Sequence, residues 1–174
     1  ELKKKKVDIL VNLSASPYTF KKLELRSTVS SFAAQYLQVP LIYVNQIGAN
    51  DNLIFDGNSF ILDKNGSNIK QLKSFAEDLS SWDITQTKPQ KNKFEESEMS
   101  SIFDALVLGV RDYAQKCGFK TALIGLSGGI DSALVSAIAT AAIGSNNIYC
   151  VSMPSKWSSS HSKSDAKDLA RRLK

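Results

Sequence analysis

The sequence predicts an α/β fold, in which a strand-rich segment with one helix precedes a doubly wound, parallel-sheet segment. Three observations predict it: short apolar runs rich in β-branched residues, apolar residues at helical spacing, and a helix–strand–helix–strand–helix order in the second half. The length of 174 residues suits one ordinary domain or two incomplete ones. The content of 43% hydrophobic and 22% charged residues excludes globally disordered, collagen-like and disulfide-scaffold proteins.

In the first half, apolar runs at residues 7–13 (VDILVNL) and 41–45 (LIYVN) predict two buried inner strands. The segment 22–38 between them has apolar residues three and four positions apart, which predicts a helix with one buried face. Two short apolar stretches follow within 51–62, and a more polar edge strand is expected near 69–75. The residues assigned to the buried helix face are Leu25, Val29, Phe32, Ala33 and Tyr36.

A polar stretch rich in Thr, Gln, Lys, Pro and Glu separates the two halves and is a candidate linker. Beyond it, residues 102–117 and 131–143 predict helices, and residues 121–126 and 148–153 predict parallel-type strands. A further helix is expected from Ser164 onward. The face expected on the first of these helices comprises Ile102, Leu106, Val110, Tyr113 and Cys117.

The net charge of +5 comes largely from lysines at 3–6 and from basic residues at the C-terminal end. This distribution is typical of solvated segments rather than of a nucleic-acid groove. No apolar run reaches the ~18 residues of a membrane span, and no secretory signal precedes the first strand. The two cysteines, Cys117 and Cys150, are too few for a disulfide framework and suggest free thiols. We therefore expect a cytoplasmic protein that binds neither nucleic acid nor membranes.

The segment 125–132 (GLSGGIDS) lies between a predicted strand and a predicted helix, where open α/β sheets bind ligands. Gly128 and Gly129 let the backbone turn sharply and bring its N–H groups close to an anion, and the helix start favours negative charge there. Because the Asp131 carboxylate would repel a bare phosphate, it reads as a ligand of a Mg²⁺ ion that lies between the two. The segment therefore predicts a pyrophosphate cradle with one metal ligand.

Glycine-rich segments of this kind also occur in other nucleotide-binding motifs and in hydrolases. No lysine follows Gly129, so the Walker A motif is absent, and so is the dinucleotide fingerprint G-x-G-x-x-G. Residues 125–129 do match the nucleophile-elbow pattern G-x-S-x-G, with Ser127 as the nucleophile. That hydrolase reading needs a histidine, and His161 lies in a Ser/Lys-rich stretch that suggests a solvated position. A purely structural glycine turn also remains open.

The motifs together resemble a known family. SGGIDS at 127–132 looks like the PP-loop of the N-type ATP pyrophosphatases, which cleave ATP between its α- and β-phosphates. MPSKWSS at 153–159 is similar to the Met-Pro-Ser-x-x-Ser-Ser stretch of NAD⁺ synthetases. The segments 12–17, 43–48 and 55–59 resemble the late part of a nitrilase-like glutaminase domain. This order of halves is that of the glutamine-dependent NAD⁺ synthetases.

The resemblance implies the C-terminal part of a nitrilase-like α/β sandwich, followed by the start of a doubly wound parallel-sheet domain of the adenine-nucleotide α-hydrolase type. We place the glutaminase part at 1–85, a linker at 86–98 and the synthetase part at 99–174. It also implies an internal fragment of a larger homo-oligomeric enzyme that is inactive alone. The glutaminase cysteine would then precede residue 1, no residue of the Glu–Lys–Cys triad would be present, and most of the deamido-NAD⁺ site would lie beyond Lys174.

The implied reaction is ATP-dependent amidation of deamido-NAD⁺ with glutamine-derived ammonia, through an adenylated intermediate that releases AMP after pyrophosphate. The resemblance assigns Mg²⁺ to Asp131 and glutamine to Ser16 and Lys22, and Lys21 stands where the family commonly has glycine. Two alternatives stay open: another PP-loop amidotransferase, such as a relative of asparagine or GMP synthetase, and a non-catalytic nitrilase-like interaction module. The residues assigned to ATP are Gly125, Leu126, Ser127, Gly128, Gly129, Ile130, Asp131, Ser132 and Met153.

Overall fold

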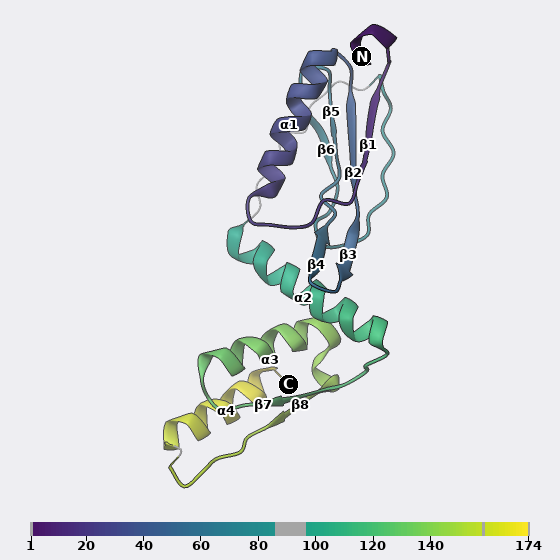
Figure 1. Ribbon diagram of the computed structural model, residues 1–174. Coiled ribbons are helices and arrows are strands. Elements are labelled where there is room, and N and C mark those ends of the chain that lie inside the picture. The colour runs from purple at the N-terminus through teal and green to yellow at the C-terminus, as the bar shows by residue number, and fades with distance from the viewer. Residues whose placement is uncertain (1, 86–96, 158, 174) are drawn as a thin grey trace. The chain divides into compact units, whose positions relative to one another are not determined.

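The computed structural model describes residues 2–85, 97–157 and 159–173 (Figure 1). It contains two compact units, Glu1–Ala105 and Leu106–Lys174, and the division falls inside one helix. Most of the predicted linker, residues 86–96, lies outside the described residues. Among the residues described, no helix combines the length and the apolar character that crossing a lipid bilayer requires.

The first unit is built around a mixed four-stranded sheet of order β1-β2-β5-β6, beside which α1 runs (Figure 1). Strands β1 and β2 are parallel and joined by α1, whereas β2–β5 and β5–β6 are antiparallel, and β3 and β4 form a separate hairpin. The elements are the 3₁₀ turn Leu2–Lys5, β1 Leu10–Ser14, α1 Lys22–Leu37, β2 Leu41–Asn45, β3 Ile47–Asn50, β4 Leu53–Asp56, β5 Phe60–Leu62, β6 Asn68–Gln71 and the start of α2 Glu98–Cys117.

The core of this unit lies between α1 and the sheet. Leu23 and Ala34 of α1 pack with Leu41, Tyr43 and Phe60 of the strands, and the rings of Tyr43 and Phe60 stack with centroids 4.9 Å apart. The stacked pair lies on neighbouring antiparallel strands in direct register, where aromatic cross-strand pairs stabilise a sheet. The predicted strand at 41–45 and the predicted helix at 22–38 are thereby confirmed to within one residue.

The predicted buried face of α1 is wrong. Leu25, Val29, Phe32 and Tyr36 are between 59% and 68% exposed, and of the five predicted residues only Ala33 packs at the edge of the core. The residues that face inward are Leu23, Arg26, Ser27, Ser30 and Ala34. The helix therefore has a small, largely polar inner face and a large apolar outer face. Apolar spacing identified the helix but could not tell which side meets the sheet.

The second unit alternates helices and strands as the sequence predicts. Strands β7 and β8 are parallel, with Gly125 opposite Val151, and α3 connects them and packs against both. Val107 of α2 meets Ile138 and Ala142 of α3 in the core. The structure thus has the predicted α/β class, with a mixed sheet and one flanking helix in the first unit and two parallel strands joined by a helix in the second. The elements are α2, β7 Ala122–Gly125, α3 Ile130–Ile143, the 3₁₀ turn Ser145–Asn147, β8 Ile148–Val151 and α4 Ser160–Leu173.

Several predictions of burial fail because no described residue covers the outer faces of the sheets. Leu13 at the end of β1 is 77% exposed and Leu123 of β7 is 74% exposed, although both strands were expected to be buried. The expected face of α2 is also largely exposed, and the buried residues of that helix are Ser101, Ala105, Val107, Leu108 and Ala114. Cys117 is exposed and Cys150 half-buried, so neither is a core packing residue.

Candidate functional site

The predicted cradle lies where the two parallel strands end. Gly125 is the last residue of β7 and Val151 the last of β8, and the N–H of Leu126 donates to the Val151 carbonyl at 2.9 Å. The Met153 side chain reaches the same place, since its Cε lies 3.6 Å from the position that a Cβ on Gly125 would take. The structure thus brings Met153 to the start of the 125–132 segment, although the two are far apart in the sequence.

Serine hydroxyls close the turn after β7. The hydroxyls of Ser127 and Ser132 are 3.1 Å apart, and the Ser132 hydroxyl also donates to the Gly129 carbonyl at 2.9 Å. The N–H of Gly129 donates to Ser127 Oγ at 3.2 Å, and the N–H of Ser127 donates to Ser132 Oγ at 3.3 Å. These bonds tie the loop to the first turn of α3, which begins at Ile130. The local geometry is that of a preformed turn at a helix N-terminus.

Gly128 is required by this turn for two independent reasons. Its φ of +87° lies in the region that L-residues avoid, and a Cβ built there would overlap the carbonyl oxygen of Ser162. The first turn of α4 therefore lies directly against the loop. That turn is capped by Ser159, whose hydroxyl accepts the N–H of Ser162 at 3.1 Å. The other serine of the MPSKWSS segment, Ser158, lies outside the described residues.

Asp131 stands in the first turn of α3 with an exposed side chain, and the preceding Ile130 is 81% exposed. The part of the chain described contains no group of three or more His, Cys, Asp or Glu that could hold a metal ion. Mg²⁺ in nucleotide sites typically takes one or two carboxylates and completes its shell with phosphate oxygens and water. A single exposed carboxylate beside a turn at a helix N-terminus fits that mode of binding, in which the ion arrives with the nucleotide.

The nucleophile-elbow reading receives no support from these contacts. Ser127 Oγ is engaged by Ser132 and by the N–H of Gly129, and neither group is a base. His161 lies in the first turn of α4 with an exposed side chain, and no hydrogen bond joins it to Ser127 within the described ranges. A catalytic serine needs a base within hydrogen-bond reach and a further group that orients the base.

In the first unit, Ser16, which is predicted to bind glutamine, is held by a buried polar network. Asn45 Oδ1 accepts the N–H of Ser16 at 2.9 Å, and Asn45 Nδ2 donates to the Ser16 carbonyl at 3.3 Å. Asn45 Nδ2 also donates to Asp56 Oδ1 at 3.3 Å. The Asp56 carboxylate, 1% exposed, accepts from Arg26 Nη2 at 2.6 Å and from Asn58 Nδ2 at 2.9 Å.

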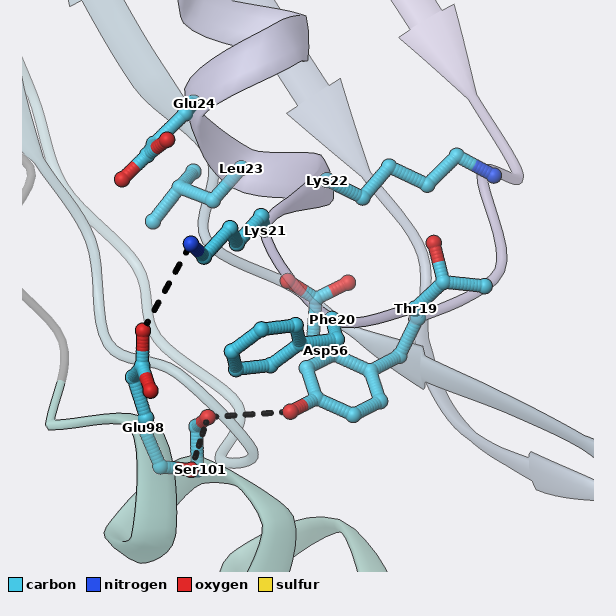
Figure 2. Close-up of a pocket in the computed structure, with 10 residues that line it drawn as sticks. Thr19, Phe20, Lys21, Lys22, Leu23, Glu24, Asp56, Glu98 and Ser101 are labelled. Carbon is cyan, nitrogen blue, oxygen red and sulfur yellow. Dashed lines mark hydrogen bonds and ion pairs between the residues drawn. The ribbon is translucent and has the colours of Figure 1, made fainter.

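Lys22, the other residue predicted to bind glutamine, is the first residue of α1 and lines a cavity of about 90 Å³ (Figure 2). The buried Asp56 carboxylate lines the same cavity, together with Lys21, Glu98 and Ser101. Figure 2 shows the Lys22 side chain extending away from Lys21, whose Nζ lies 3.8 Å from Glu98 Oε1. Ser16 does not line this cavity, so the structure places the two predicted residues at neighbouring but distinct points of the β1–α1 connection.

The residue before Lys22 adopts a left-handed backbone conformation that favours glycine. Lys21 caps α1 with φ 61° and ψ 8°, in the left-handed region. Replacing Lys21 by glycine should raise the free energy of unfolding by about 0.5–1 kcal/mol, because glycine enters this region without the Cβ clash. The lost ion pair with Glu98 is exposed on both sides and contributes little.

Chemical denaturation of both proteins measures this change. The matched control is Lys22→Gly, in which glycine replaces a lysine of ordinary helical conformation and should lower stability by up to ~1 kcal/mol. Equal destabilisation by the two substitutions would contradict the account.

The sequence does not predict the contacts around Asp56. Asn45, Asp56 and Asn58 lie in the segments 43–48 and 55–59, which resemble a glutaminase domain, but no role follows from that resemblance for any one of these side chains. Arg26 follows Lys22 by four residues, so it lies on the same side of α1 one turn further along, and this spacing is a second signal in the sequence.

Comparisons with known proteins place both halves. Residues 1–91 match the carbon-nitrogen hydrolase family model and residues 102–174 match the NAD synthase family model. The chain is 48% identical over 172 residues to the glutamine-dependent NAD(+) synthetase of Synechocystis sp., and 40% identical to that of Rhodobacter capsulatus. These alignments cover 96% and 95% of this chain but 31% of each relative.

A solved structure is similar along almost the whole chain. The glutamine-dependent NAD⁺ synthetase of Acinetobacter baumannii, determined in complex with ADP, superposes with a TM-score of 0.88 at 38% identity. The match covers 99% of this chain and 34% of that one, so the chain spans about a third of the length of the relatives it matches. By these matches, the chain belongs to the carbon-nitrogen hydrolase family, whose model covers residues 1–91, and its residues 102–174 are similar to the NAD synthase family model.

Proposed function

We propose that this chain acts in the ATP-dependent amidation of deamido-NAD⁺ to NAD⁺ with glutamine-derived ammonia, as a ligase that releases AMP and pyrophosphate. The observation that carries the proposal is the serine-closed turn at 125–132, which stands at the carboxyl edge of the parallel strands and requires glycine at 128. The names of the relatives, and the ADP complex of the Acinetobacter baumannii enzyme, support the choice of nucleotide and reaction.

In this proposal ATP binds along the residues assigned from the sequence, 125–132 and Met153. Backbone N–H groups of the turn and the N-terminus of α3 stabilise the charge that develops on the departing pyrophosphate. Asp131 holds Mg²⁺, which neutralises phosphate charge when it is bound. The Met153 side chain, which lies beside Gly125, forms one wall of the nucleotide site.

We assign the binding of glutamine to Ser16 and Lys22. Lys22 supplies a cation for the substrate carboxylate at the start of α1, and the main chain of Ser16 is fixed by one hydrogen bond to the Asn45 side chain and one from it. We keep the division into a glutaminase part at 1–85, a linker at 86–98 and a synthetase part at 99–174. A homo-oligomer is part of the proposal and is supported by the exposed apolar side of α1. A cytoplasmic location suits the two free thiols.

Titration calorimetry of the full-length protein that carries these residues tests the function. Binding of both ATP–Mg²⁺ and deamido-NAD⁺, together with NAD⁺ formation from glutamine or ammonia, is the expected result. Binding of ATP alone would indicate a PP-loop amidotransferase that acts on a different acid. Binding of neither ligand would indicate a non-catalytic module and end the proposal.

Replacing Asp131 by asparagine should raise the Mg²⁺ concentration needed for half-maximal NAD⁺ synthesis by about tenfold or more, because the amide keeps the size of the ligand and removes its charge. Initial rates across a magnesium titration at saturating ATP measure the effect. The matched control is Asp104→Asn, since Asp104 is an exposed carboxylate of α2. The same magnesium response in both variants would show that Asp131 does not bind the ion.

A further inference from the structure

We propose that Asn45 and Asp56 are positioning residues, which orient the Ser16 segment for glutamine because Asp56 sets the direction of the Asn45 side-chain amide. The inference rests on the proposed function, since it takes Ser16 as a glutamine-binding residue. Neither residue is assigned to bind substrate itself. Both are buried, and both act through contacts with the connection between β1 and α1.

The Asn45 side-chain amide uses both of its ends to hold Ser16. A side-chain amide accepts hydrogen bonds at its oxygen and donates them from its nitrogen, so its direction decides what it can bind. Asn45 uses both ends on the main chain of Ser16, accepting its N–H and donating to its carbonyl. Ser16 lies outside any strand, and these two bonds hold its main chain from both polar groups. With the amide reversed, donor would face donor and acceptor would face acceptor.

The buried Asp56 carboxylate prevents reversal of the Asn45 amide. The Asp56 carboxylate, paired with Arg26, offers only acceptors, so the Asn45 nitrogen and not its oxygen must face it. Asp56 is itself fixed by Asn58, and Asn58 Oδ1 accepts from Gln71 Nε2 at 3.1 Å. The main chain of Asn45 is fixed as well, because its N–H donates to Ser59 Oγ at 3.0 Å. The carboxylate thereby selects one of the two amide directions.

Exchanging the residue types at positions 45 and 56, which preserves the total charge, tests in the full-length protein whether Asp56 orients the Asn45 amide. Asp56→Asn and Asn45→Asp each disrupt the contact between residues 45 and 56. The double variant Asn45→Asp/Asp56→Asn restores a donor–acceptor pair at that contact and keeps one buried carboxylate near Arg26, but the carboxylate at position 45 cannot donate to the Ser16 carbonyl. Chemical denaturation measures the stability of all three variants. The rate of NAD⁺ synthesis is measured with glutamine and, separately, with ammonium chloride as the nitrogen source. The matched control is Asn50→Asp, which adds the same charge at an exposed position at the end of β3.

Each single variant should raise the KM for glutamine by about tenfold or more while leaving the ammonia-supported rate within about twofold, because only the glutamine side depends on Ser16. The double variant should recover stability lost at the contact between residues 45 and 56 but should not recover the glutamine KM, because the carboxylate at position 45 has no hydrogen to donate to the Ser16 carbonyl. If Asp56→Asn does not fold, Asn45→Asp carries the test, since it leaves Asp56 and Arg26 in place.

Two results would overturn the inference. One is an unchanged KM for glutamine in the single variants. The other is a double variant in which the glutamine KM recovers together with the stability, since the loss would then come from destabilisation and not from the contact with Ser16. Failure of the proposed function looks different: the unsubstituted protein would then form no NAD⁺ from either nitrogen source, and the inference would fall with it.

Discussion

Replacing Gly128 by alanine is expected to abolish ATP-dependent synthesis in the full-length protein and to lower the free energy of unfolding by several kcal/mol. The new Cβ would overlap the Ser162 carbonyl oxygen. That oxygen belongs to the backbone of a helix, so no change of rotamer can relieve the overlap. Either α4 or the loop must therefore move. The positive φ adds a backbone penalty of ~1 kcal/mol for any L-residue.

The chain offers a matched control at Gly118, which follows α2. Its φ is +73°, close to that of Gly128, but a Cβ built there meets nothing within 4 Å. Gly118→Ala should therefore cost only the backbone penalty, about 1 kcal/mol, and leave ATP binding intact. Urea denaturation and ATP titration of the two variants separate close approach from backbone conformation. Equal losses in both would mean that α4 does not lie against the loop in solution.

The turn at residues 125–132 could be predicted from the sequence because its determinants are local. The strand, the two glycines, the serines and the first turn of α3 all lie within residues 122–132, and each hydrogen bond that a serine hydroxyl makes in the turn joins residues at most five apart. Residue type and spacing describe such a structure almost completely. The contact with Ser162 is the exception, and nothing in the spacing indicated it.

The network around Asp56 could not be predicted because it is assembled by topology. Arg26 is thirty residues from Asp56, and Ser16 is twenty-nine residues from Asn45. These partners meet only after α1 has crossed over to place β2 parallel to β1 and the β3–β4 hairpin has returned. The predicted buried face of α1 is wrong for the same reason. Its inner face is polar because Asp56 on another element accepts Arg26, and periodicity alone assigned that face to the solvent.

Replacing Arg26 by methionine is expected to destabilise the first unit by about 3–5 kcal/mol. Arg26 and Asp56 are both buried, and removing the guanidinium leaves the carboxylate with only the amides of Asn45 and Asn58. An uncompensated buried charge has a large free-energy cost, which pairing otherwise offsets. The exposed pair Arg172–Asp168 of α4 is the control, and Arg172→Met should cost less than ~0.5 kcal/mol. Denaturation curves of the two variants compare the pairs directly.

The double variant Arg26→Met/Asp56→Leu distinguishes stabilisation from specificity. Arg26 Nε and Nη1 are buried, and no described group accepts a hydrogen bond from either, so desolvation of the guanidinium is only partly offset. An apolar pair of similar volume should therefore recover most of the stability that Arg26→Met loses. Glutamine use should not recover with it, because Asn45 would have lost the acceptor that sets its amide direction. A double variant as unstable as the single one would instead show that the ion pair itself stabilises the unit.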